Sequence, residues 1–208
     1  MRRTAEDAAK TRLALLQAAL MSFESKGWRG ATFEHIAERA GVTRGALNHH
    51  FQSKTELLSA ALEWGWATYG DRLFTDDLPE NPTPRDSAQW LTALLSGYVT
   101  RLQTDDQFRA LASTTVLVAP QATGPGDAKT QALDAWKDRI ADAVVQRAPR
   151  APQAPRPPRA SSTKTIAGMV LTLLQGLTVT AVTRPHDLPQ PDDLDAAMSA
   201  LVRGLLDT

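Results

Sequence analysis

The chain has 208 residues, enough for one sizeable domain or two small ones. Hydrophobic residues make up 42% of it and charged residues 22%, which is typical of folded globular proteins and excludes a disordered chain. The absence of cysteine excludes a disulfide scaffold, a thiolate metal site and a cysteine nucleophile. The 23 basic and 23 acidic residues cancel, and this balance alone argues against a nucleic-acid partner.

The charges are nevertheless distributed unevenly. Residues 1–54 contain nine Lys and Arg residues against five acidic residues, a net charge of +4, so residues 55–208 carry −4. All thirteen prolines follow residue 78, so the first 78 residues can be helical without a proline break. Such an asymmetry between two parts of a chain points towards a nucleic-acid partner for the basic part.

The N-terminus is polar and charged and has no apolar region, so we expect no secretion signal and a cytoplasmic protein. Thr165–Thr183 is an uncharged stretch of nineteen residues and is the candidate for a membrane span. Its threonines, glutamine and glycines favour instead a helix covered by other helices, by a partner subunit, or by both. We therefore expect no membrane association.

Three helices are predicted in the first 54 residues from apolar spacing and from capping residues. They span Thr11–Lys26 with a stop at Gly27, the stretch from the N-cap Thr32 to Gly41, and Arg44–Phe51 after the N-cap Thr43. The second and third helices, joined by a three-residue turn, form a helix-turn-helix.

The rest of the chain also shows helical spacing. A Ser-Lys-Thr-Glu capping box at residues 53–56 opens a fourth helix that runs to about residue 72. Further helices are predicted over Asp86–Thr104, from a second capping box at 104–107 to near residue 119, over Asp127–Ala148, around 163–183, and over Asp192–Leu206. Residues 149–158 contain five prolines and are expected to form an extended loop. No strand pattern is found, so we expect an all-α fold with about nine helices.

The third helix has the composition of a DNA-recognition helix. Leu47 and Phe51 are four residues apart and should dock on the core, so the positions left facing outward are Gly45, Ala46, Asn48, His49 and Gln52. The two small residues permit close approach to DNA. Arg44 suits guanine, Asn48 suits adenine, and His49 can donate to a base or a phosphate.

Two alternatives accompany this interpretation. Lys54 lies in the first turn of the fourth helix, where the dipole disfavours a cation; a bound phosphate would resolve the conflict, but a solvated helix end would also be ordinary. His49 and His50 could be a surface pair or part of a metal site, but no third ligand has suitable spacing, so we expect no metal.

Residues 11–62 resemble the DNA-binding head of TetR/AcrR-type transcriptional regulators. The resemblance is carried by the glycine after the first helix, Thr32, IAERAGV, TRGAL, HHF, and a lysine three residues after the phenylalanine. It implies an all-α homodimer, with a DNA-binding domain in residues 1–54 and a ligand-binding and dimerisation domain in residues 55–208. The last two helices would form the dimer interface. The residues carried over by position to the DNA are Thr32, Thr43, Arg44, Gly45, Ala46, Asn48, His49, His50 and Lys54.

One position departs from the family pattern. The family usually has a tyrosine where this chain has Asn48, and that tyrosine is typically a phosphate or base-edge contact. The replacement leaves the operator sequence open, and the affinity with it, but not the fold.

The expected function is a homodimeric repressor that binds a pseudo-palindromic operator and is released by a small hydrophobic ligand. Candidate ligand residues are the aromatic and polar side chains Trp64, Trp66, Trp90, Tyr98, Phe108, Trp136, Met169 and Gln175, for each of which core packing is the competing role. The alternatives are a ligand-independent regulator or an activator. No nucleophile elbow, metal-ligand cluster or phosphate-binding loop is found, so we expect neither an enzyme nor a cofactor.

Overall fold

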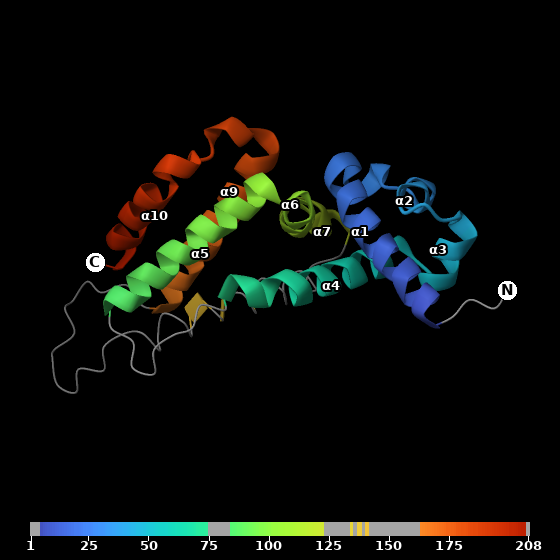
Figure 1. Ribbon diagram of the computed structural model, residues 1–208, viewed down its shortest axis with the longest axis horizontal. Helices are drawn as coiled ribbons and strands as arrows, with labels where there is room; N and C mark the ends of the chain where they lie inside the picture. The colour runs from blue at the N-terminus through green and yellow to red at the C-terminus, as the bar shows by residue number, and fades with distance from the viewer. Residues whose placement is uncertain are drawn as a thin grey trace. The chain divides into compact units, whose positions relative to one another are not determined.

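The computed structural model describes residues 5–74 and 84–122, the positions 134, 137, 138, 140 and 141, and residues 163–206. Regular structure in these ranges is entirely helical, which confirms the all-α prediction (Figure 1). The elements are α1 (Ala5–Gly30), α2 (Phe33–Arg39), α3 (Arg44–His50), α4 (Lys54–Phe74), α5 (Pro84–Thr104), α6 (Asp106–Ser113), the π-helix η1 (Thr114–Val118), α7 (Ala119–Ala122), α9 (Thr163–Thr183), the 3₁₀-helix η2 (Pro185–Asp187) and α10 (Pro191–Leu206).

The predicted helix over Asp127–Ala148 is described only at positions 134, 137, 138, 140 and 141, which are helical. The rest of that helix and the proline-rich stretch 149–158 lie outside the described residues.

The chain divides into two compact units. The first unit comprises Met1–Arg72 and Thr104–Lys129, and the second comprises Leu73–Gln103 and Thr130–Thr208. Helices α6 and α7 therefore pack with α1–α4 although α5 precedes them in the chain. The boundary predicted near residue 54 separates a DNA-binding domain from a ligand-binding domain by function, not by packing, and it stays a prediction.

The first unit is built around an apolar core that α1 to α4 share with α6, η1 and α7. Gly27 ends the regular part of α1 with a φ of 66°, in the left-handed region where glycine is favoured, as the sequence predicted for this position. The largest fully buried side chains of this core are Leu15, Leu16, Leu20, Phe23, Ile36, Leu47, Phe51, Leu57 and Leu58.

The N-cap of helix α6 is Asp105, one residue later than the Thr104 that the sequence predicted. The Asp105 carboxylate, not the Thr104 hydroxyl, accepts a hydrogen bond from the Phe108 N–H at 3.0 Å. A carboxylate at this position also interacts favourably with the helix dipole. After Ser113 the helix widens into the π-helix η1, whose hydroxyls at Thr114 and Thr115 are buried.

The second unit contains α5, α9, η2 and α10. Its core is lined by apolar residues of all three α-helices, among them Leu91, Leu95, Val99, Ala167, Val170, Leu174, Met198 and Val202. The Tyr98 and Thr178 hydroxyls join α5 to α9 through a buried hydrogen bond of 2.7 Å. The segment Lys164–Thr183 is apolar and long enough to cross a membrane by composition, and 33% of its most apolar stretch is buried inside the protein. One helix of this kind is weak evidence for a membrane span, because core helices of soluble proteins meet the same criteria.

Candidate nucleic-acid interface

The turn between α2 and α3 is set by backbone hydrogen bonds. Gly41 has a φ of 68°, and the N–H of Val42 donates to the Ala37 carbonyl at 2.9 Å, which closes α2 in a Schellman arrangement. The next helix starts at once, because the Thr43 hydroxyl accepts from the Ala46 N–H at 3.1 Å. The Thr32 hydroxyl caps α2 in the same way, through the His35 N–H at 3.2 Å. Both caps were predicted from the sequence.

Helix α3 docks as its spacing predicted. Leu47 and Phe51 are 0% and 1% exposed, which anchors one face of the helix in the core of the first unit. The opposite face is open: among the predicted DNA contacts, Thr32, Thr43, Arg44, Gly45, Asn48 and His49 are exposed, while Ala46, His50 and Lys54 are half-buried. The structure therefore brings amide, imidazole and guanidinium groups to one surface with small residues between them.

Arg44 has an intramolecular partner that the sequence interpretation did not consider. Its Nη1 forms an ion pair with Oε1 of Glu34, across the turn in the first turn of α2. Both side chains remain more than half exposed, so the guanidinium can still be reached from solvent.

Lys54 is also held from within the protein. Its Nζ donates to the Trp28 carbonyl at 2.5 Å and lies 4.4 Å from the centre of the Trp28 ring. Partial burial lowers the pKa of Lys54. The conflict between this cation and the α4 dipole is thus eased by a carbonyl and an aromatic face. A phosphate contact at Lys54 would have to use the remaining N–H donors of the ammonium.

The predicted capping box at the start of α4 is present in a modified form. The Ser53 hydroxyl accepts from the Glu56 N–H at 3.1 Å, as expected. The Glu56 carboxylate reaches back one residue further than predicted and accepts from the Gln52 N–H at 2.7 Å. Two hydrogen bonds to Glu56 therefore fix the loop between α3 and α4, one from Gln52 and one at Ser53.

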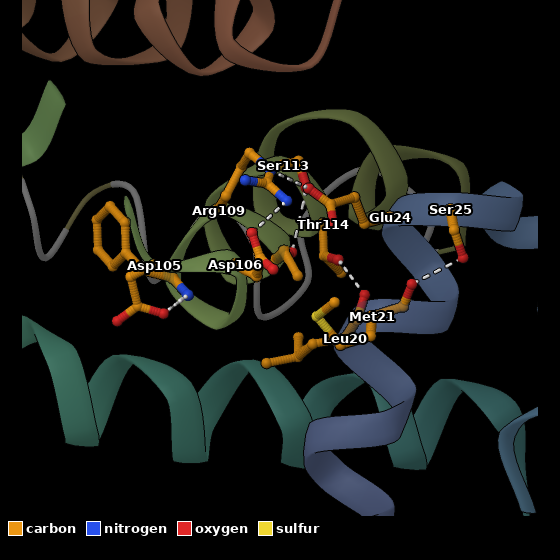
Figure 2. A network of polar contacts seen from close by, with 11 residues as sticks. Leu20, Met21, Glu24, Ser25, Asp105, Asp106, Arg109, Ser113 and Thr114 are labelled. Carbon is orange, nitrogen blue, oxygen red and sulfur yellow. Dashed lines mark hydrogen bonds and ion pairs between the residues drawn. The ribbon is translucent and has the colours of Figure 1, made fainter. Parts of the chain in front are cut away.

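Behind this surface, α1 is tied to α6 by a polar network (Figure 2). Arg109 Nε donates to Oε1 of Glu24 at 3.1 Å, and its Nη2 lies 2.9 Å from Oδ1 of Asp106. The Thr114 hydroxyl donates to the Leu20 carbonyl at 3.4 Å. Burial raises the pKa of Glu24 despite the opposing effect of the Arg109 charge. Ionised Glu24 therefore depends on Arg109 for its stabilisation.

Comparison with known proteins agrees with this geometry. Residues 15–61 match the sequence model described as bacterial regulatory proteins, tetR family. This match covers the helix-turn-helix region, so residues 15–61 are similar to the DNA-binding part of TetR-family regulators. The chain is 46% identical over 63 residues to the HTH-type transcriptional regulator TtgR of Pseudomonas putida, a match that covers 30% of each chain. The chain thus matches about a third of the length of its curated relatives.

Solved structures extend the likeness of fold over nearly the whole chain. AibR, solved in complex with isovaleryl coenzyme A and operator DNA, aligns with a TM-score of 0.69 at 18% identity, covering 92% of this chain and 97% of that one. SmeT, the repressor of a Stenotrophomonas maltophilia multidrug efflux pump, aligns with a TM-score of 0.66 at 22% identity, covering 95% and 92%. Both likenesses concern fold. TtgR is named as a transcriptional regulator and SmeT as a repressor.

The predicted TetR-type ligand residues are divided between the two units. Trp64, Trp66 and Phe108 belong to the first unit, where the Trp66 indole donates to the Thr115 hydroxyl at 3.0 Å and its ring meets Phe108 edge-on. Trp90, Tyr98, Met169 and Gln175 belong to the second, where Trp90 and Tyr98 are buried and Met169 is 51% exposed. Trp136 lies outside the described residues. Core packing accounts for the buried members, and their ligand role stays a prediction.

Sequence reasoning missed the partners Glu34, Trp28, Glu24 and Arg109. Glu34 could have been found, because it lies on the helix that faces Arg44 across a three-residue turn. The Glu24–Arg109 pair is separated by 85 residues, and no local pattern reports a contact of that kind.

Proposed function

We propose that this chain is a TetR-type transcriptional regulator, a cytoplasmic homodimer that binds a pseudo-palindromic operator and represses transcription. The observation that carries the proposal is helix α3, anchored by Leu47 and Phe51 and presenting Arg44, Asn48 and His49 outward. In a dimer, two such helices enter successive major grooves, so the two-fold symmetry of the protein is matched by that of the site.

The proposed dimer surface is the outer face of α9 and α10. Met169 and Val182 on α9 and Leu201 on α10 are large apolar side chains at least 37% exposed. Large apolar side chains left exposed in this way are candidates for cover by a second subunit. The family resemblance independently implies the last two helices for this role. Replacing Leu201 with Glu should shift the sedimenting species from dimer to monomer. The same replacement at the neighbouring exposed Ala200 tests how far the interface extends along α10.

The proposed effector is a small, apolar or aromatic compound bound within residues 55–208. AibR, a neighbour of the same fold, was solved with isovaleryl coenzyme A, which supports a ligand site in this fold but is an acyl thioester and not a small apolar compound. A ligand that favours a conformer with wrongly spaced heads would lower the affinity for DNA, and DNA would lower the affinity for ligand by the same factor.

The DNA proposal is tested by footprinting on DNA that flanks the protein's own gene, followed by a salt series with Arg44→Ala. We expect a symmetric footprint, and a loss of about 5- to 150-fold in operator affinity from removing a bidentate base contact. Arg184→Ala is the matched control, because Arg184 is an exposed cation paired with Asp187 in the second unit. Sequence-selective binding that is insensitive both to salt and to Arg44→Ala would contradict the proposal.

The ligand proposal is tested by titrating the protein–operator complex with apolar, aromatic and short acyl-thioester compounds. Release of DNA by one class, with reciprocal weakening of that ligand by DNA, is the expected result. If no compound alters operator binding, the regulator is ligand-independent and this part of the proposal is wrong.

A further inference from the structure

The ion pair between Glu34 and Arg44 places a carboxylate beside the side chain proposed to recognise guanine. Arg44 is the first residue of α3 and Glu34 lies in the first turn of α2, so the pair bridges the two helices of the helix-turn-helix. The Arg44 and Glu34 side chains are 62% and 57% exposed. An exposed ion pair contributes little to folding stability, so stability is a poor reason for an acid at this position.

A negative charge on a DNA-binding surface also has a direct cost, since it is repelled by phosphates. The ordinary explanation of Glu34 is its favourable interaction with the α2 dipole. If that explanation is sufficient, replacing Glu34 should not change which DNA sequence is bound. If Glu34 acts through Arg44, the replacement should change it.

The chemistry of the guanidinium separates two kinds of DNA contact. Arg44 has five N–H donors in a planar fork, and the contact with Glu34 uses Nη1, which leaves the other donors for DNA. A guanine edge offers two neutral acceptors, O6 and N7, whereas a backbone phosphate brings a full negative charge. A phosphate that approaches Arg44 meets repulsion from Glu34, and a guanine edge does not.

Holding the guanidinium in advance also reduces the rotamer entropy that is lost when Arg44 engages a base. We propose that Glu34 is a positioning residue that makes Arg44 select a guanine edge over backbone phosphate, and so raises sequence specificity. The inference rests on the proposed function, because it requires that α3 meets DNA.

The experiment compares two duplexes of equal length: one selected from random sequence by the wild-type protein, and a scrambled version of it. The full-length variants are Glu34→Gln, Arg44→Ala and the double variant. Glu38→Gln is the matched control, because Glu38 is an exposed acid one turn further along α2 and has no ion pair among the described residues. Thermal melts of each variant separate a DNA effect from loss of fold.

We expect Glu38→Gln to change binding to both duplexes by the same factor. Glu34→Gln should strengthen binding to the scrambled duplex and lower the ratio of selected to scrambled affinity by about three- to tenfold, a part of the discrimination carried by a bidentate base contact. The preference for guanine at one position should weaken with it. In the Arg44→Ala background, Glu34→Gln should no longer change the ratio.

If Glu34→Gln and Glu38→Gln give the same ratio of selected to scrambled affinity, the positioning role is wrong. Binding of the selected duplex by the wild type would still uphold the proposed function in that case. A ratio unaffected by Arg44→Ala would overturn the role as well, because there would be no reader to position. If the wild type selects no duplex, the proposed function itself has failed.

Discussion

The two units leave different kinds of surface outside a similar apolar core. In the first unit, α3 buries Leu47 and Phe51 and exposes mainly polar groups and glycine. In the second unit, α9 and α10 bury their own apolar stripes yet leave Met169, Val182 and Leu201 exposed. Exposed amide, imidazole and guanidinium groups suit a hydrated, charged partner such as DNA, and exposed apolar side chains suit another protein surface. The two units thus differ in the surfaces on which the two proposed partners, operator DNA and a second subunit, would bind.

The polar links inside the two units differ as well. In the first unit, α1 and α6 are joined by a charged and partly exposed pair, Glu24 and Arg109. In the second, α5 and α9 are joined by two neutral, buried hydroxyls, Tyr98 and Thr178. The charged link should respond to pH near the carboxylate range and the neutral one only at high pH.

The largest expected effect separates the two faces of α3. Replacing Phe51 with Ala should lower the free energy of unfolding by about 3–5 kcal/mol, because it empties a fully buried site. Asn48→Ala, on the exposed face of the same helix, should change it by no more than about 0.5 kcal/mol. Urea denaturation measures both. Equal losses from the two variants would mean that α3 does not dock as described.

The second effect tests the neutral link of the second unit. Burial raises the pKa of Tyr98 to about 12 from an ordinary value of 10. Since the unfolded state loses this proton first, the stability linked to Tyr98 is intact below pH 10 and is lost as the pH rises towards 12. The wild type should lose about 2–3 kcal/mol relative to Tyr98→Phe over that range. Parallel curves of stability against pH for the two proteins would refute the burial argument.

The third effect tests the charged link of the first unit. Arg109→Ala should cost about 1–3 kcal/mol at pH 7, because it leaves the Glu24 carboxylate, 13% exposed, without its counter-ion. The pKa of Glu24 is already raised, so protonation relieves this cost as the pH falls, and the loss should be smaller at pH 5. Arg101→Ala in α5 is the control, because the contact of Arg101 among the described residues is a long one, 3.4 Å from Nη1 to the Gly97 carbonyl of the same helix. A loss independent of pH would point to packing instead of charge.

The smallest effect concerns two glycines of the helix-turn-helix. Gly41→Ala should cost about 1 kcal/mol, because the φ of 68° is unfavourable for any residue with a Cβ. Gly45→Ala should stabilise the fold by up to about 1 kcal/mol, since an added Cβ meets nothing closer than the Thr43 hydroxyl at 3.8 Å. Gly45→Ala should weaken operator binding although it does not destabilise the turn. If it leaves operator binding intact, the helix does not approach DNA closely at that position.

Much of the fold was predictable because its determinants are local. The caps Thr32, Thr43 and Ser53 were assigned from neighbouring residues, and each forms the expected hydrogen bond. The docking of Leu47 and Phe51 followed from helical spacing alone. The cap of α6 was misplaced by one residue because Thr104 and Asp105 are both suitable capping residues, and local sequence does not rank them.

The sequence by itself determined the helical fold, the turn at Gly41 and the open face of α3, because each depends on residues within one or two helical turns. Tertiary structure alone decided which charges meet: Lys54 with the carbonyl and ring of Trp28, Arg109 with Glu24, and Arg44 with Glu34. It also decided that α6 packs with the N-terminal helices although α5 intervenes. Such contacts depend on how helices distant along the chain fit together, and the spacing of residues within a single helix carries no information about them.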